Sequence, residues 1–283
     1  MSAESREVKL AEALPHAPGV REEIVAGAQL VQERTGLAGH DLLITLGSGL
    51  RDALEGEVRA RIPLADLPGV PAPAAEGHGG ELLSLDIPVA DSGGTVHCLV
   101  ATGRNHLYEG FSPTTVVQLS RVAAMCGVRA ALLTNAGGCL REWELGDIML
   151  IDNHVNLSGE SPFEGAVFVD IWKIWDEELS SVLAPHTSRR GVYAIMRGPE
   201  FQTEAESILL RAGGVDMVGM STVMEAIALH QLGVRVCGLS VTSDLSFSSQ
   251  PTAHEDVLAA ARGSYPAVRE AIDDLCAALA AQV

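Results

Sequence analysis

Basic residues are scarce in this sequence. Lysine and arginine together number 19, against 37 aspartates and glutamates, so the 283-residue chain has a formal net charge of −18 at pH 7. Because the acidic excess is spread along the chain, most of the surface repels phosphate backbones, and we expect no nucleic-acid partner. One small anion held in a local site is still compatible with this charge.

Paired cysteines and long apolar runs are also missing, and we expect no leader segment. The five cysteines are scattered, odd in number and never spaced as CxxC, which indicates free thiols in a reducing compartment. No apolar run approaches the roughly 20 residues that span a membrane. The polar start "MSAESREVKL" lacks the apolar segment of a signal peptide. We therefore expect a cytoplasmic protein with no membrane partner.

Two kinds of catalytic motif are absent as well. The nine histidines are dispersed without HxxxH or comparable ligand spacing, so the sequence predicts no metal site. No GxSxG motif is present, and a Ser/His/Asp hydrolase therefore has no support.

What the sequence does contain is an alternation of short apolar runs with helical patterns. Nearly continuous apolar runs are typical of strands buried on both faces, and their alternation with helices predicts an α/β fold in a single domain, residues 1–283. We expect residues 1–19 to be a flexible N-terminal segment and the Pro/Gly-rich residues 61–80 to be a mobile loop. Strands are expected at 41–49, 96–106, 130–138, 147–156, 192–200 and 234–244, and helices at 20–34, 113–126, 203–212, 221–232 and 254–281.

Polar residues close several of these runs, where open α/β sheets bind ligands. Ser48 lies between two glycines in "LGSGLRD", and two more glycines follow a strand in "TNAGGCL" (134–140). Arg104 and His106 alternate after another run, and Ser221 stands where a helix would begin. Each feature has an ordinary alternative, namely a tight turn, a solvated arginine or a helix cap. Four such features at four strand ends together favour a phosphate site.

The ordered motifs of the chain resemble those of the trimeric purine nucleoside phosphorylases, a family related to the methylthioadenosine phosphorylases. The matching segments run from about residue 42 to 260: "GSGL", "GHGGEL", "TGRNHLYEG", "TNAGG", "LGDIMLIDNHVNL", "GPEFQTEAE", "VGMSTVMEA" and "HEDVL". The resemblance implies a mixed, largely parallel α/β sheet flanked by helices and a homotrimer. It also implies phosphorolysis of nucleosides to free base and pentose 1-phosphate, with inorganic phosphate as co-substrate and no cofactor.

The resemblance further implies a role for individual residues. The residues implied to bind phosphate are Ser48, His78, Arg104, His106, the backbone at Ala136, and Ser221. Those implied to face the pentose are Tyr108, Met220 and His254, with Phe168 as the aromatic inserted into a neighbouring subunit's site. Those implied to surround the base are Phe201, Gln202 and Asp244. The residues expected to act in catalysis are Asp244, His106 and Gln202.

Two of these positions depart from the family pattern. Many members that split 6-oxopurine nucleosides carry Glu where Gln202 stands and Asn where Asp244 stands. Adenine offers an acceptor at ring nitrogen 1 and a donor at its 6-amine, which Gln202 and Asp244 can meet. We therefore expect a preference for 6-aminopurine nucleosides such as adenosine. A neutral exchange, with 6-oxopurine cleavage retained, is the alternative.

Two further residues bear on the same question. His254 suits a 5′-hydroxyl better than a methylthio group, which favours adenosine over methylthioadenosine. Cys139 stands where the family usually has glycine, which leaves the shape of the phosphate loop open.

Two other classes of protein fit parts of the sequence. A nucleotide-dependent oxidoreductase could use the "GSGLRD" turn, but it predicts an acidic residue about 20 positions further on, where a Pro/Gly-rich segment follows instead. A non-catalytic nucleoside-binding protein could keep the fold. It would have no need to retain Ser48, Arg104, His106 and Ser221 together.

Overall fold

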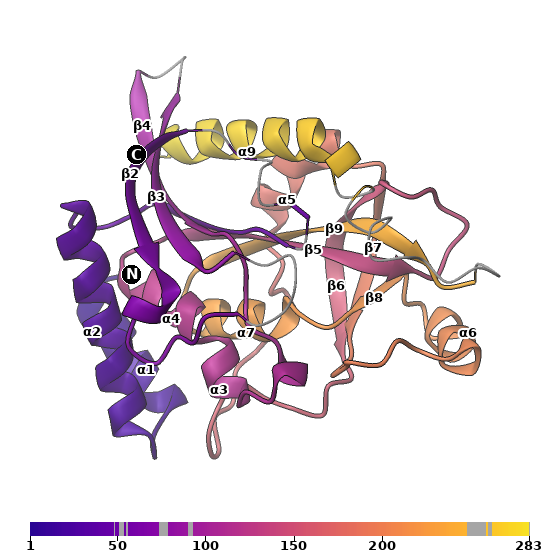
Figure 1. The fold of residues 1–283 in the computed structure, drawn as a ribbon, viewed down its shortest axis with the longest axis horizontal. Coiled ribbons are helices and arrows are strands. Elements are labelled where there is room, and N and C mark those ends of the chain that lie inside the picture. The colour runs from indigo at the N-terminus through magenta and orange to yellow at the C-terminus, as the bar shows by residue number, and fades with distance from the viewer. Residues whose placement is uncertain are drawn as a thin grey trace.

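The centre of the computed structural model is a mixed sheet in the order β2-β3-β4-β1-β5-β8-β7-β6-β9 (Figure 1). The structure describes residues 1–47, 49–50, 54, 56–73, 79–89, 93–247, 259 and 262–282. The strands are β1 (Leu42–Thr45), β2 (Glu57–Pro63), β3 (Glu81–Val89), β4 (Gly94–Ala101), β5 (Ala130–Cys139), β6 (Ile148–Asn156), β7 (Arg189–Ile195), β8 (Met217–Gly219) and β9 (Arg235–Leu245).

Strand β5 joins the two halves of this sheet. On one side it pairs in parallel with β1, which is itself parallel to β4. On the other side it pairs with both β8 and β9, and β9 pairs with β6 as well. Strands β5, β8, β7, β6 and β9 therefore close into a ring. The amino half of β5 (Ala130–Leu133) pairs with β1 and its carboxyl end pairs with β8, so β5 runs from the open part of the sheet into this ring.

Helices cover both faces of the sheet. They are α1 (Ala3–Ala13), α2 (Pro18–Thr35), α3 (Pro113–Val116), α4 (Gln118–Met125), α5 (Glu177–Leu183), α6 (Glu204–Ala212), α7 (Val223–Gln231) and α9 (Tyr265–Ala280), with single 3-10 turns at Leu64–Asp66, Leu107–Glu109 and Ala184–His186. Helices α5 and α9 pack on one face, whereas α1, α2, α4 and α7 pack on the other (Figure 1). The predicted mixed, largely parallel sheet flanked by helices is confirmed.

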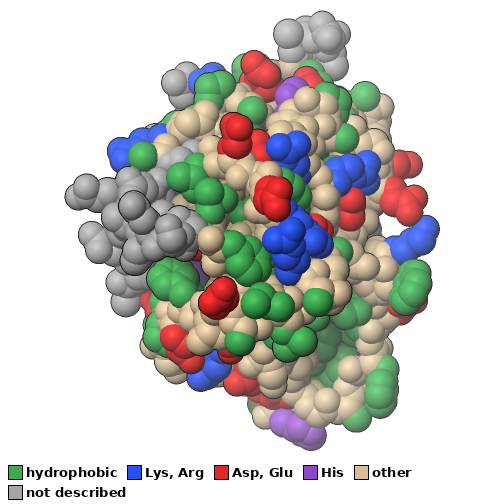
Figure 2. Space-filling model, turned by 90° about the vertical axis from the view of Figure 1, so that its right-hand side faces the viewer, with side chains coloured by type: hydrophobic (Ala, Val, Ile, Leu, Met, Phe, Trp, Pro, Cys, Tyr) green, Lys and Arg blue, Asp and Glu red, His purple; other side chains and the backbone are tan. Residues whose placement is uncertain are grey.

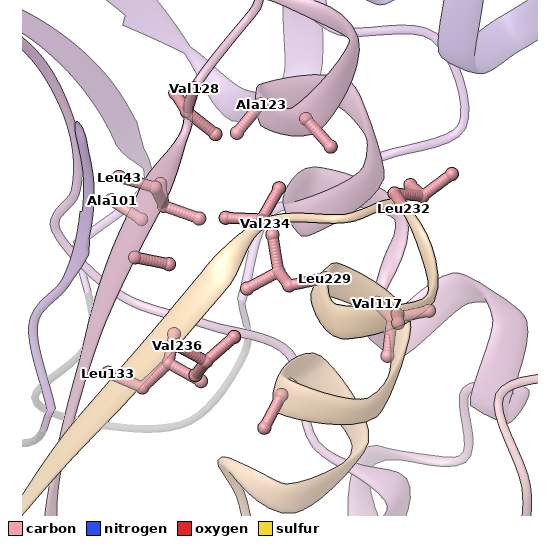
Figure 3. Packing of buried hydrophobic residues seen from close by; sticks show 14 of the residues in the cluster. Leu43, Ala101, Val117, Ala123, Val128, Leu133, Leu229, Leu232, Val234 and Val236 are labelled. Atoms are coloured by element: carbon pink, nitrogen blue, oxygen red, sulfur yellow. The ribbon is translucent and has the colours of Figure 1, made fainter. Parts of the chain in front are cut away.

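Aliphatic side chains of β5 and β9 bind α4 and α7 to the sheet. Leu133 and Val236 point from the two strands toward α7, and Leu229 of that helix points back toward the sheet, whereas Ala123 of α4 lies at the other end of the same layer (Figure 3). All four side chains are fully buried. Burial of a leucine or valine contributes roughly 1.5–3 kcal/mol, so this layer holds α7 firmly against the sheet.

The N-terminal segment differs from the expectation of a flexible 1–19. Residues 3–13 form helix α1, which begins at the N-cap Ser2, whose side chain accepts a hydrogen bond from the backbone N of Ser5 at 3.2 Å. Arg6, Leu10 and Leu14 recur on one face and are at most 3% exposed. This periodic face gives the segment enough apolar surface to join the core, and sequence reasoning overlooked it because charged residues surround it.

Other elements were missed for recognisable reasons. Strand β2 lies at the edge of the sheet, and most of its side chains are exposed, so it shows no apolar run. Residues 61–80 were expected to form one loop, but β2 extends to Pro63 and a 3-10 turn follows. The final helix was expected over 254–281, whereas α9 begins at Tyr265 with a proline in its first turn. Residues 251–258, 260 and 261 lie outside the described part of the chain.

Candidate active site

The predicted phosphate residues come from the carboxyl ends of β4 and β5 and from the turn before α7. Arg104 and His106 follow β4, Ala136 lies within β5, and Ser221 lies between β8 and α7. Ser48, His78 and His254 lie outside the described residues. Their predicted roles in phosphate and pentose binding therefore stay predictions.

Arg104 is buried and held from two sides. It is 4% exposed, and its Nη1 donates a hydrogen bond to the backbone oxygen of Thr134 in β5 at 2.6 Å. Its Nε lies 2.9 Å from Oε2 of Glu225 in α7. A buried guanidinium is tolerated when a carboxylate lies close enough to neutralise its charge. The arginine is therefore oriented toward the end of β5 by two independent elements.

His106 is fixed by Glu109 and stacks on Tyr108. Oε1 of Glu109 accepts hydrogen bonds from the backbone N of His106 at 2.7 Å and from its Nδ1 at 3.0 Å. A carboxylate only accepts, so the imidazole carries a proton on Nδ1. The rings of His106 and Tyr108 stack with centroids 4.6 Å apart. Burial, together with the charge of Glu109, raises the pKa of Tyr108 to about 12, so its phenol stays neutral at physiological pH.

The turn that carries Ser221 is strained. Thr222 has φ of 79°, and among the described residues it is the one non-glycine with positive φ. Its Oγ1 accepts a hydrogen bond from Nδ2 of Asn135 at 2.9 Å, and Asn135 accepts in turn from Ser240 in β9 at 2.6 Å. Sequence reasoning offered Ser221 as an ordinary helix cap, but the cap of α7 is Thr222. Ser221 therefore lies just outside the helix.

The glycine-rich turn after β1 presses against the same part of β5. Gly47 donates from its backbone N to Oγ1 of Thr134 at 3.0 Å, and that hydroxyl donates to the backbone oxygen of Thr45 at 2.9 Å. A Cβ at Gly47 would lie 2.7 Å from Cα of Asn135, so only glycine fits this approach. The turn that leads into residue 48 is thus anchored beside the residues that hold Arg104.

A second cluster of polar side chains lies around the carboxyl end of β5. Nε2 of Gln202 donates a hydrogen bond to Oγ of Ser246 at 2.8 Å. A Cβ built on Gly138 would lie 3.1 Å from Oγ of Ser246, and 3.3 Å from both Oδ2 of Asp244 and Nε2 of Gln202. The two predicted base-reading residues therefore converge although 42 positions separate them in the sequence. Sequence reasoning missed Ser246, although a hydroxyl two positions after Asp244 lies on the same side of an extended chain.

For the remaining predicted site residues, the structure gives fewer contacts. Met220 contacts Gly198, which precedes the cis peptide bond to Pro199 at the start of the Gln202 segment. Phe201 is 77% exposed, and Phe168 is 95% exposed. Both aromatic side chains are therefore largely exposed in the single chain, and the expected insertion of Phe168 into a neighbour's site stays a prediction.

The outer face near α6 carries more exposed apolar side chains. Ile208 and Leu209 of α6 are 55% and 72% exposed, and Phe247 beyond β9 is 40% exposed. Hydrophobic side chains on this side of the molecule lie interspersed with acidic and basic ones (Figure 2).

Two further observations concern classes of site. Within the described residues, no group of three or more His, Cys, Asp or Glu side chains is arranged to hold a metal ion. In the same part of the chain, the helices are too short or too polar to cross a membrane.

Comparisons with known proteins identify the family. Residues 41–277 match the model of the phosphorylase superfamily. The curated purine nucleoside phosphorylase of Mycobacterium leprae is 40% identical over 257 residues, which cover 88% of this chain and 94% of that protein. The purine nucleoside phosphorylase of a Cellulomonas species is 38% identical over 258 residues, covering 88% and 91%. The chain belongs to the phosphorylase superfamily.

Solved structures agree with this assignment. Isoform 2 of the Schistosoma mansoni purine nucleoside phosphorylase, in complex with cytosine and ribose-1-phosphate, superposes with a TM-score of 0.80 at 28% identity, covering 90% of this chain and 96% of that one. The S. mansoni enzyme in complex with inosine has a TM-score of 0.79 at 26% identity over the same shares. The predicted family and enzyme class, a purine nucleoside phosphorylase and thus a pentosyltransferase, are confirmed.

Proposed function

We propose that the protein cleaves purine nucleosides with inorganic phosphate, releasing the free purine base and a pentose 1-phosphate. The observation that carries this proposal is the arrangement along the end of β5. The buried Arg104 contacts Thr134, and the Gln202 and Asp244 side chains gather at Gly138. A strand rises about 3.3 Å per residue, so these two positions are about 13 Å apart. Phosphate, pentose and base in a line fit such a span.

The chemistry suits the residues at the phosphate end. Phosphate is already an anionic nucleophile, so the protein needs no nucleophilic side chain and no cofactor. Arg104, His106 and Ser221 would hold it beneath the anomeric carbon, where positioning and charge stabilise an oxocarbenium-like transition state. The fixed tautomer of His106 supports this role, because Glu109 leaves the ring oriented in one way.

The leaving base needs its growing negative charge neutralised. In its protonated form Asp244 would pass a proton to ring nitrogen 7 of the purine instead of accepting a hydrogen bond from a 6-amine, and such general acid catalysis contributes on the order of 10²–10⁴ in rate. Gln202 would hold the base in register for that transfer. Tyr108, Met220 and His254 would face the pentose.

We further propose a preference for adenosine. Gln202 presents an amide N–H₂ beside the carboxylate of Asp244, and together they form the complement of adenine's ring nitrogen 1 and 6-amine. The alternative is a preference for 6-oxopurine nucleosides. In that case the amide of Gln202 would accept from ring nitrogen 1 through its oxygen, and a protonated Asp244 would donate to the 6-oxygen. The S. mansoni enzyme has been solved with adenosine and with inosine, so the fold is compatible with both bases.

The assembly and location are part of the same proposal. Phe168 and Trp172 are 95% and 85% exposed on the segment that follows β6, which suits burial against a second copy in a homotrimer. The five cysteines are free and buried, as expected in the reducing cytoplasm.

The test is a substrate panel with and without phosphate. Purified protein would be given adenosine, inosine or methylthioadenosine, and the free base and pentose 1-phosphate would be quantified. We expect cleavage that requires phosphate, with kcat/KM highest for adenosine. Inosine preferred by a wide margin would refute the adenosine preference alone. Nucleoside binding without phosphate-dependent turnover would refute the enzymatic proposal.

A further inference from the structure

The carboxylate of Glu225 joins the two elements that carry the candidate phosphate residues. Glu225 lies in the first turn of α7 and is 4% exposed. Its Oε2 accepts a hydrogen bond from the backbone N of Thr222 at 3.1 Å and lies 2.9 Å from Nε of Arg104. One oxygen atom therefore ties the turn that contains Ser221 to the guanidinium that follows β4.

The turn depends on this oxygen. Thr222 is β-branched and has φ of 79°, a conformation that such residues rarely adopt. Asn135 holds its side chain, and Glu225 accepts from its backbone N–H. Without that acceptor the N–H would be buried and unpaired, and the turn would lose a contact that offsets its strain. Ser221 is the neighbouring residue and would move with it.

The guanidinium depends on the same carboxylate. Arg104 is buried, so its charge needs a partner before any phosphate arrives. Glu225 supplies that charge at Nε while the oxygen of Thr134 takes a hydrogen bond from Nη1. Contacts at two different nitrogens fix the plane of the guanidinium. A binding group that is already oriented needs no rearrangement when the anion enters.

We propose that Glu225 is a positioning residue for phosphate: it holds Arg104 and the Ser221 turn in one fixed relation. The inference rests on the proposed function, because it takes Arg104 and Ser221 to be phosphate ligands. Glu225 acts through them and does not touch the phosphate. Its loss should therefore weaken phosphate binding selectively and leave nucleoside binding largely intact.

The test variant is Glu225→Gln, which keeps the side-chain length and can still accept from Thr222, but removes the charge that faces Arg104. We expect the KM for phosphate to rise by about tenfold or more, while the KM for adenosine changes by less than about threefold. A second readout needs no nucleoside. Inorganic phosphate should raise the Tm of the unaltered protein, and the variant should lose most of that rise.

The chain offers a matched control in Glu206. Its Oε2 accepts from the backbone N of Thr203 at 2.7 Å in the same kind of capping box, at the start of α6, but on the surface. Glu206→Gln should leave the KM for phosphate unchanged. If Glu225→Gln fails to fold, Glu225→Asp is the variant to measure in its place. It keeps the charge but is too short to reach both partners, so the KM for phosphate should again rise.

The outcomes separate the two proposals. Phosphate-dependent cleavage by the unaltered protein, with an unchanged KM for phosphate in both Glu225 variants, would overturn the role of Glu225 and leave the proposed function standing. An equal rise of KM for phosphate in Glu206→Gln would also overturn it, because a generic capping effect would then explain the result. No phosphate-dependent cleavage by the unaltered protein would refute the proposed function and this role with it.

Discussion

Exchanging both base-reading residues should reverse the base preference. The double variant Gln202→Glu, Asp244→Asn presents ring nitrogen 1 with an acceptor and the 6-position with an amide. The exchange should be tolerated structurally, because the hydroxyl of Ser246, now 2.8 Å from Nε2 of Gln202, can donate to a glutamate instead. The change therefore acts on the ligand more than on the fold.

The size of the effect follows from the number of mismatched groups. Adenine would face one acceptor opposite its ring nitrogen 1 and would lose the carboxylate that accepts from its amine. Each buried polar group left unpaired costs about 1–3 kcal/mol, so two of them cost about 2–6 kcal/mol. At about 1.4 kcal/mol per factor of ten, the ratio of kcat/KM for adenosine to that for inosine should fall by about 30-fold to 10⁴-fold.

The assay is steady-state phosphorolysis of both nucleosides at saturating phosphate. Gln32→Glu is the control, since Gln32 donates to the oxygen of Ala38 on the surface of α2 and the same exchange there should not move the ratio. A change of less than about threefold in the double variant would show that Gln202 and Asp244 do not read the base. Each single variant should move the ratio in the same direction by a smaller factor.

Three further predictions concern stability. Gly47→Ala should cost about 1–3 kcal/mol and most of the activity, measured by urea unfolding and turnover, because its Cβ would meet the backbone of Asn135; unchanged values would contradict the close approach. Burial lowers the pKa of His40 from 6.5 to about 4, so as the pH drops below 6.5 the unfolded chain takes up a proton before the folded one does, and the free energy of unfolding falls. Between pH 7 and about 5 this loss is about 2 kcal/mol. In paired unfolding curves at the two pH values, His40→Gln should abolish the pH-dependent loss. Arg6→Ala should lower the free energy of unfolding by about 2–4 kcal/mol, because its guanidinium donates to the backbone oxygens of Ala124 in the last turn of α4 and of Val128 just beyond it. An unchanged free energy of unfolding would mean that α1 is not part of the folded core.

The sequence predicted most elements that are buried on both sides. The apolar run at 130–138 became β5, and the runs at 147–156 and 234–244 became β6 and β9 within a residue or two. Such strands can be predicted from the sequence because a strand that is buried on both faces consists of continuous apolar residues. The edge strand β2 and helix α1 were missed because only one face of each is buried, and their exposed residues dilute the pattern.

The site was predicted in part and for a different reason. The family motifs named Arg104, Gln202 and Asp244, and the structure brings these three side chains to the two ends of one stretch of β5. The motifs also named Ser221, whose neighbour Thr222 is held by Asn135 of the same strand. The motifs did not single out Glu225, because a glutamate in the first turn of a helix is an ordinary capping residue. Its second contact, with Arg104, is visible only when β4 and α7 are placed together.

The sequence by itself determined the family, the α/β alternation and the residue types available for phosphate and base. These depend on local order along the chain, namely short apolar runs, glycine turns and motifs of a few residues. Only the tertiary structure decided which side chains meet: Gln202 with Ser246, Glu225 with Arg104, and Asn135 with Thr222. Those pairs lie 44, 121 and 87 positions apart, and they are created by the sheet that closes around β5. A long-range contact has no local pattern, because nothing in the chain near one partner depends on the other until both are packed.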